Sequence, residues 1–483
     1  MGVQILNDKT EFLNIRDLPK TLLVLGNGFD LTCRVPSDYK KFFEYILEKK
    51  LNYYYEELQR DGYSNIFEYT LSEIERYLKD INFAQDGGIR KSEVVPELNS
   101  WYIIFLYRKM TNDMDWFQVE NQIANQLTPK DNSMNIVESI GDSLLSIYQN
   151  SKSMIRTQRI SHLNNKEIEK IYELLSYNLL NKKLDSFNVE GSKDLFIEFR
   201  KKENELWEEY HEYDKRNIGS ITERKKFEDS FDSKLEKELF PMVAQVLLAE
   251  LKELEMDFRE YLTLSISKLS YSYQKEAGDL IESILGKIGK ETKISPYNIL
   301  TFNYSTPWDM SEKGNRTEYL HPIFEENPIN TLNLHGRLDS ETKEIIFGVD
   351  DEFLSPISNE YIFTKTSRTL DLYTKVMFEE WFENSSMSEI LSPSIKEIIF
   401  FGHSLSKADY GYFRKILDSY IYNPEAHFIF VYNVYEGTTT DKKRRELIHS
   451  ISSLFGEYSI NKQSNTDIFR NLIQNNRIKI VEL

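Results

Sequence analysis

The sequence has a single cysteine, Cys33, among 483 residues. One thiol cannot form a disulfide within the chain, and it cannot build a cysteine-rich zinc site. So little cysteine is typical of a reducing compartment, and we therefore expect a cytoplasmic protein.

Long apolar runs are also missing. No stretch approaches the roughly 20 apolar residues that a membrane-spanning helix needs, and the first 20 residues lack the apolar segment of a signal peptide. We expect no membrane association. Basic residues are in deficit, with 60 Lys and Arg against 78 Asp and Glu and a net charge of −18. This deficit disfavours non-specific binding to nucleic acid.

The chain is organised around a short apolar run, Leu22–Leu25, which predicts a buried parallel strand. It ends at Gly26-Asn27-Gly28, and a loop then leads to Ser37, which we expect to cap a helix over 37–50. A strand, a glycine turn and a helix can hold a phosphate. A dinucleotide fingerprint needs a third glycine where Leu31 stands, so a tight turn without a ligand stays an open alternative.

The pattern of apolar and charged residues changes twice along the chain. Residues 51–294 carry helical periodicity and many charges, whereas short apolar runs alternating with helical segments return after 294. The runs that predict strands are Tyr297–Phe302, Thr331–Leu334, Ile345–Val349, Glu397–Phe401, His427–Tyr432 and Ile478–Leu483. We predict an α/β fold with a parallel sheet, built from 15–50 plus 295–483, and a helical domain of 51–294 inserted into it.

Polar groups or glycines follow five of these strands. They are Gly26–Asp30, Asn303–Ser305, His335-Gly336, Gly348–Asp351 and Gly402–Leu405, with Asp409 downstream. Each has a simpler explanation as a turn or helix cap. Because ligands of open α/β sheets bind at the carboxyl ends of the strands, the shared position favours a ligand site.

These motifs resemble the AbiH family of bacteriophage abortive-infection proteins. The resemblance rests on GNGFDL at 26–31, FNYS at 302–305, LHG at 334–336 and FGHSL at 401–405 with Asp409. Trp116 and Glu120 match a further element of that family in the helical region, and one helix turn would place them on the same face. A core tryptophan beside a paired glutamate is the alternative for that element.

The same motifs also resemble a distant sirtuin nucleotide site. The resemblance implies a Rossmann-like, sirtuin-like sheet and NAD as the substrate, with cleavage of the nicotinamide–ribose bond. Ser305 stands where sirtuins have an aspartate, and the four zinc-binding cysteines of protein deacylases are missing. Protein deacetylation is therefore not expected, and we expect no metal site. The implied nucleotide-binding residues are Gly26, Asn27, Gly28, Phe29, Asp30, Tyr304, Gly336, Gly402, His403, Ser404 and Leu405.

The chemistry of NAD hydrolysis demands little beyond positioning, exclusion of water and one base. We hypothesise that His335 is this base and that Asn303 orients the water or the ribose. The hypothesis makes the protein an antiviral NAD glycohydrolase that a phage-derived trigger activates, and we expect a homo-oligomer.

Two other functions stay open. One is a nucleotide-sensing module without turnover that acts through a partner. The other is a nuclease that holds Mg²⁺ with Asp30, Glu120, Asp350 or Asp351, and it leaves the LHG and FNYS motifs without a role.

Overall fold

The computed structural model describes most of the chain, in the ranges 18–51, 62, 66–83, 98–110, 118–129, 134–150, 172, 174–176, 178–179, 182, 187–215, 221–269, 271–288, 295–309, 321–325, 328–339, 344–351, 354–375, 386–434, 439–462 and 468–483. Trp116 lies outside these ranges. The chain divides into two compact units. Unit 1 comprises 1–35, 266–339 and 376–483, and unit 2 comprises 36–265 and 340–375. The domain boundaries expected from sequence stay a prediction.

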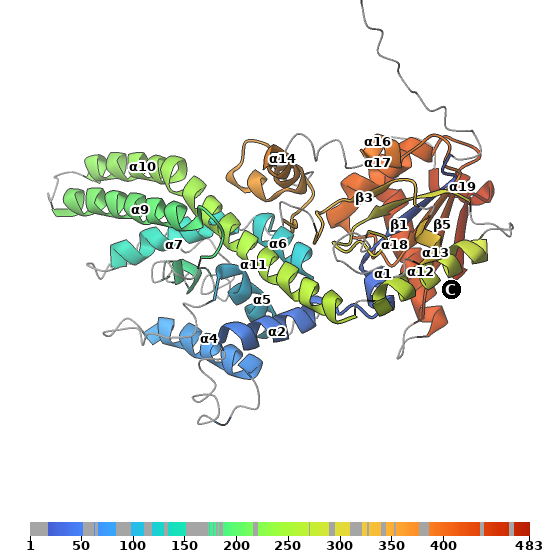
Figure 1. The fold of residues 1–483 in the computed structure, drawn as a ribbon. Coiled ribbons are helices and arrows are strands. Elements are labelled where there is room, and N and C mark those ends of the chain that lie inside the picture. The colour runs from blue at the N-terminus through green and yellow to red at the C-terminus, as the bar shows by residue number, and fades with distance from the viewer. Residues whose placement is uncertain are drawn as a thin grey trace, which may run out of the picture. The chain divides into compact units, whose positions relative to one another are not determined.

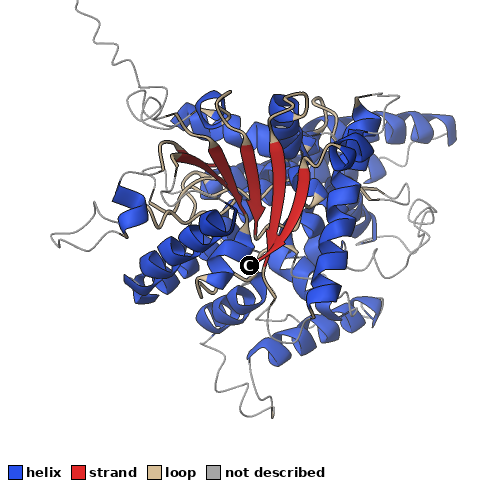
Figure 2. Cartoon of the chain, turned by 90° about the vertical axis from the view of Figure 1, so that its right-hand side faces the viewer, coloured by secondary structure: helices blue, strands red, loops and turns tan. Residues whose placement is uncertain are grey.

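Unit 1 contains a six-stranded sheet in the order β3-β2-β1-β4-β5-β6 (Figure 1). Every pairing is parallel, and Figure 2 shows the strands side by side in one fan. The predicted α/β class with a parallel sheet is confirmed. The strands are β1 (Thr21–Leu25), β2 (Tyr297–Thr301), β3 (Thr331–Asn333), β4 (Glu397–Phe401), β5 (His427–Tyr432) and β6 (Ile478–Glu482).

The central strands β1 and β4 are apolar except for their first residues, Thr21 and Glu397, as expected for a sheet that is covered on both faces. One face carries Leu22, Val24 and Phe400, which pack with apolar side chains of α17 (Tyr410–Tyr420) and α18 (Thr440–Asn461). The remaining helices of unit 1 are α1 (Asn27–Thr32), α12 (Tyr271–Ile288), α13 (Pro322–Glu325), α16 (Met387–Ile390) and α19 (Ile468–Gln474). The segment η9 (Lys407–Asp409) is a short 3₁₀ turn that directly precedes α17.

The strand ends are level at the carboxyl edge of the sheet. Leu25 pairs with Thr301 of β2 on one side and with Phe401 of β4 on the other. Thr301 pairs in turn with Asn333, the last residue of β3. The loops that follow β1, β2, β3 and β4 therefore all begin at the same edge.

Unit 2 is helical. Its helices are α2 (Tyr39–Leu51), α4 (Ile66–Phe83), α5 (Ser100–Met110), α6 (Val119–Leu127), α7 (Ile136–Asn150), α9 (Ser192–Lys215), α10 (Ile221–Glu238), α14 (Lys365–Lys375) and η8 (Asn359–Phe363), together with α11 (Phe240–Leu269), which ends in unit 1. Aromatic side chains fill the contact of α2 with α11, where the ring of Phe42 lies 5.0 Å from that of Phe258.

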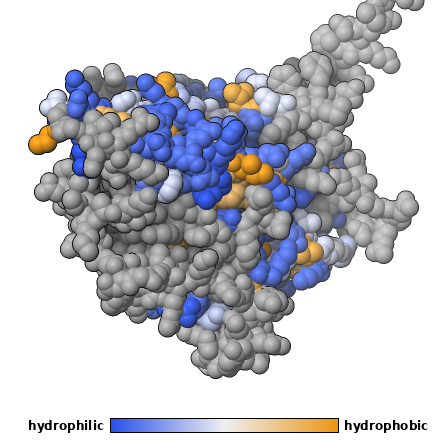
Figure 3. All heavy atoms as spheres, turned by 90° about the vertical axis from the view of Figure 1, so that its left-hand side faces the viewer, coloured by the Kyte–Doolittle hydropathy of each residue, from blue (hydrophilic) through white to orange (hydrophobic). Residues whose placement is uncertain are grey.

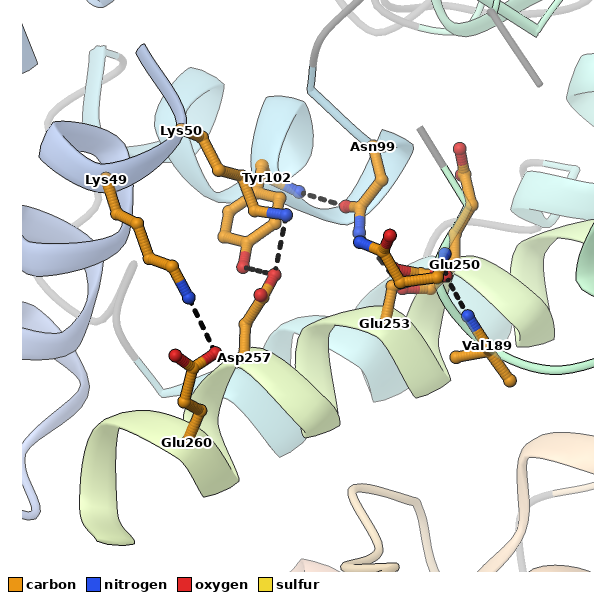
Figure 4. Close-up of polar contacts among 10 residues, drawn as sticks. Lys49, Lys50, Asn99, Tyr102, Val189, Glu250, Glu253, Asp257 and Glu260 are labelled. Carbon is orange, nitrogen blue, oxygen red and sulfur yellow. Dashed lines mark hydrogen bonds and ion pairs between the residues drawn. The ribbon is translucent and has the colours of Figure 1, made fainter. Parts of the chain in front are cut away.

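Helix α11 organises this unit through acidic side chains (Figure 4). Asp257 accepts hydrogen bonds from the hydroxyl of Tyr102 at 2.8 Å and pairs with Lys50 at 2.8 Å. The buried Glu250 accepts from the backbone N–H of Ser100 at 3.0 Å and pairs with Lys182 at 2.7 Å. Buried carboxylates need such partners, and these join α11 to α2, α5 and Lys182.

Two sequence predictions are wrong in detail. Ile345–Val349 was predicted as a strand, but it lies in unit 2 and forms no strand. Ile345 and Val349 each make only an isolated bridge, and the partner of Val349 is Thr364. The apolar run is buried against helices instead, since the Phe347 ring lies 5.5 Å from that of Phe258. Apolar burial does not distinguish a strand from an extended segment on a helical core.

The second error concerns the first helix start. Helix α1 begins inside the glycine turn, with Gly26 at its N-cap, and the next helix, α2, starts only at Tyr39. Ser37 does not cap it, because the carboxylate of Asp38 accepts from the backbone N–H of Lys41 at 2.9 Å. Asp and Ser are equally good caps, so the sequence left the choice between adjacent residues open.

Among the described residues, no helix is both long enough and apolar enough to cross a membrane. The coloured side chains on the face shown in Figure 3 are mainly hydrophilic, with small apolar patches between them.

Candidate functional site

Four of the five predicted strand ends meet at the carboxyl edge of the sheet in unit 1. The fifth, Gly348–Asp351, belongs to unit 2 and is not part of this edge. The remaining loops are joined by hydrogen bonds. Asn303 donates from Nδ2 to the carbonyl oxygen of Gly26 at 3.1 Å, and Asn333 donates from Nδ2 to the carbonyl oxygen of Asn303 at 2.8 Å.

The glycines of the β1 turn make room for the loop that follows β4. A Cβ atom on Gly28 would lie 2.6 Å from Cα of Gly402, and one on Gly26 would lie 2.7 Å from Cα of His403. The backbone N–H of Gly28 donates to the carbonyl oxygen of Gly402 at 2.7 Å. Close backbone packing therefore accounts for both glycines.

Asp409 lies between two histidines. Its Oδ1 is 3.7 Å from Nε2 of His335, and its Oδ2 is 3.3 Å from Nε2 of His403. All three side chains are at most 7% exposed. His335 follows β3, His403 follows β4, and Asp409 ends η9 and is the N-cap of α17. Three separate segments thus bring two imidazoles and one carboxylate together.

Aromatic rings surround this group. The ring of Phe302 lies 5.6 Å from that of His335 and 4.4 Å from that of His403. The Tyr412 ring lies 5.6 Å from His335. Apolar walls strengthen charge interactions between the groups that they enclose, because they keep the local dielectric low. The arrangement can hold a carboxylate against an imidazole that takes up a proton.

Asp30 is engaged within the protein. The hydroxyl of Ser305 lies 2.9 Å and 2.8 Å from its two carboxylate oxygens, and the hydroxyl of Tyr273 lies 2.9 Å from Oδ1. Burial raises the pKa of Asp30 to about 6, against the lowering effect of these hydrogen bonds. Ser305 is therefore a partner of Asp30.

The other predicted nucleotide-binding residues differ in exposure. Asn27 and Ser404 are exposed, and Gly28, Gly336 and Gly402 are half-buried. The remaining ones have buried side chains, and these are Phe29, Tyr304 and Leu405. Leu405 belongs to the apolar core of unit 1. Their nucleotide-binding role stays a prediction.

The four carboxylates of the predicted Mg²⁺ site are divided between the two units. Asp30 lies in unit 1, whereas Glu120, Asp350 and Asp351 lie in unit 2. Glu120 pairs with Lys365 at 2.9 Å. Asp351 accepts from the hydroxyl of Thr366 at 3.1 Å. The nuclease hypothesis stays a prediction.

Sequence reasoning left the role of Asp409 open. Asp409 and His335 are far apart in the sequence, so the sequence alone does not predict that they make contact. The signal that could have identified it was its place six residues after His403, close enough for a short loop to bring the carboxylate back to the imidazole.

Comparison with protein families gave one match. The model described as "Bacteriophage abortive infection AbiH" matches residues 22–199 and 187–432. Comparison with curated proteins and with solved structures gave no match. The family match covers both units and every motif of the carboxyl edge, and the chain belongs to the AbiH family of bacteriophage abortive-infection proteins.

Proposed function

We propose that this protein acts in abortive infection by hydrolysing the nicotinamide–ribose bond of NAD at the carboxyl edge of its sheet. The observation that carries the proposal is Asp409, whose carboxylate lies 3.7 Å from His335 and 3.3 Å from His403 beside the β1 turn. Family membership supports the abortive-infection role.

The fold supports a nucleotide as the ligand. The strand order β3-β2-β1-β4-β5-β6 is that of doubly wound dinucleotide-binding sheets, and their ligands bind where the order reverses. Here the order reverses between β1 and β4. His335 and Asn303 follow the next strands outward, β3 and β2, so a nucleotide over this edge would lie within reach of both.

The reaction needs one base. The C–N bond breaks with its electron pair leaving on nicotinamide, and a water oxygen bonds to C1′ of the ribose. His335 accepts the proton of that water, and Asp409 stabilises the imidazolium that forms. Asn303 holds the turn at Gly26 and orients the water or the ribose. We further propose a homo-oligomer and a phage-derived trigger.

Nicotinamide release from NAD by the purified protein, alone and with a phage-infected lysate, tests the proposal. His335→Ala should lower the rate at least about a hundredfold, the usual contribution of a positioned base, whereas the exposed His449→Ala should leave it unchanged. Turnover by His335→Ala at the normal rate would contradict the assignment. NAD binding without turnover by the wild-type protein would support the sensing module instead.

A further inference from the structure

Both ring nitrogens of His403 are engaged within unit 1. The backbone N–H of Leu405 donates to Nδ1 at 2.8 Å. A peptide N–H can only donate, so Nδ1 carries no proton, and the proton of the neutral ring lies on Nε2. Nε2 is the atom that lies 3.3 Å from Oδ2 of Asp409. The contacts thus define both the tautomer of His403 and the direction of its proton.

The backbone of this loop is unusual. Gly402 has φ +71° and Leu405 has φ +55°, and the second value is uncommon for a residue with a side chain. Leu405 keeps this conformation because its side chain is buried in the core of unit 1. Residues held in sparsely populated backbone regions cost free energy and cluster at functional sites. In this loop, the left-handed backbone conformation of Leu405 occurs together with the hydrogen bond from its N–H to Nδ1 of His403.

The ring itself cannot turn freely. It stands edge-on to Phe302 at 4.4 Å and to Phe413 at 4.8 Å, and its side chain is 6% exposed. The nucleotide contact that the sequence predicts for His403 would therefore have to compete with four contacts made inside the protein.

We propose that His403 is a positioning residue that acts on His335 through Asp409. It donates Nε2–H to Oδ2 of Asp409, and this bond directs Oδ1 toward Nε2 of His335. The inference rests on the proposed function only in naming His335 as the base, since the orientation of the three side chains is a separate structural claim.

Two substitutions at His403 test the roles of its two ring nitrogens separately. The amide of His403→Gln reaches the place of Nε2 and can donate to Asp409. The amide of His403→Asn reaches only the place of Nδ1 and cannot. Asparagine is one methylene smaller than glutamine, so His403→Met, which is about as long as glutamine but carries no donor, separates the effect of the donor from that of the lost packing.

Two-bond ¹H–¹⁵N spectra of protein labelled at its seven histidines test the orientation without any substrate. His403, identified by the signal lost in His403→Gln, should show the Nε2–H tautomer. The ring signals of His335 should stay close to wild type in His403→Gln and move in His403→Asn. An Nδ1–H tautomer at His403, or an equal movement of His335 in both variants, would overturn the proposal.

Turnover tests the consequence. We expect kcat of His403→Asn to fall about tenfold below that of His403→Gln, with KM changing by less than about twofold. Equal kcat values in the two variants would overturn the positioning role. If wild-type protein does not turn over NAD, the proposed function fails, and the spectra alone decide the arrangement of His403, Asp409 and His335.

Discussion

At the scale of single residues, burial controls the chemistry of the β1 turn. Cys33, the only thiol of the chain, is 1% exposed. Burial and the nearby Asp30 raise the pKa of this thiol far above its ordinary range. Such a thiol is not a reactive nucleophile. The carboxyl group of Asp30 is buried in the same surroundings. Because burial raises its pKa, the gain or loss of its proton changes the stability of the fold.

Asp30 makes stability depend on pH in a defined direction. Its pKa is about 6 in the folded protein against an ordinary 3.8, so the folded state binds the proton more tightly than the unfolded state. The contribution of Asp30 to stability is therefore greatest at low pH and falls as pH rises from about 4 to about 6, by about 3 kcal/mol over the whole window.

Urea unfolding of the wild type and of Asp30→Asn at pH 5 and pH 7.5 measures this effect. The wild type should lose about 1.4 kcal/mol relative to the variant between these pH values, since the remainder of the window lies below pH 5. The exposed Asp441→Asn serves as a control and should follow the wild type. If the unfolding free energies of the wild type and Asp30→Asn changed equally between pH 5 and pH 7.5, the carboxyl group of Asp30 would be ionised in the folded protein over this whole range.

At the scale of elements, the candidate site depends on how closely two loops approach. The β1 turn and the β4 loop touch through backbone atoms, and a Cβ atom on Gly402 would lie 2.4 Å from the backbone nitrogen of Phe29. The same loop carries His403, and η9 after it carries Asp409. Any separation of the loops would move both groups relative to His335.

Alanine substitutions at these glycines measure the approach. Gly28→Ala and Gly402→Ala should each lower the free energy of unfolding by about 2 kcal/mol or more, because a backbone atom cannot move aside cheaply. Gly286→Ala is the control. It lies in α12 with nothing within 4 Å of its added Cβ, so it should gain up to about 1 kcal/mol from helix propensity. Thermal or urea unfolding checks all three, and a neutral Gly28→Ala would mean that the loops are not packed as described.

At the scale of the whole molecule, each unit combines segments that are distant in the sequence. Unit 2 takes in 340–375 after the chain has passed through the second segment of unit 1. A buried ion pair attaches this segment to α11. Arg368 donates to both carboxylate oxygens of Glu255, at 2.9 Å and 2.6 Å. The backbone N–H of Phe347 donates to the same carboxylate at 2.7 Å.

Removing the arginine should destabilise unit 2 strongly. Arg368→Met leaves Glu255 buried without its cation, and we expect a loss of about 3 to 5 kcal/mol in unfolding free energy. Arg224→Met breaks an exposed pair with Glu228 and should cost less than about 0.5 kcal/mol. The double variant Arg368→Met with Glu255→Leu should recover part of the loss, and a double variant as unstable as the single one would show that packing, not charge, decides the effect.

Much of the fold was predictable because the strands of a covered parallel sheet are mostly apolar. The runs at 22–25, 297–302, 397–401 and 427–432 are mostly apolar, and each contains a strand of the sheet. Ile345–Val349 is mostly apolar too, yet packs on helices, since burial alone does not require strand pairing.

The sequence by itself determined the parallel sheet, the helical texture of 51–294, the family and the strand ends that carry polar residues. Local pattern is sufficient for these, because hydrophobic periodicity and turn residues act over a few positions. Only the tertiary structure decided that Asp409 lies between His335 and His403, that Ser305 holds Asp30, and that the glycines at 26 and 28 accommodate the β4 loop. These contacts join segments up to several hundred residues apart, and their partners are chosen by packing in three dimensions rather than by spacing along the chain.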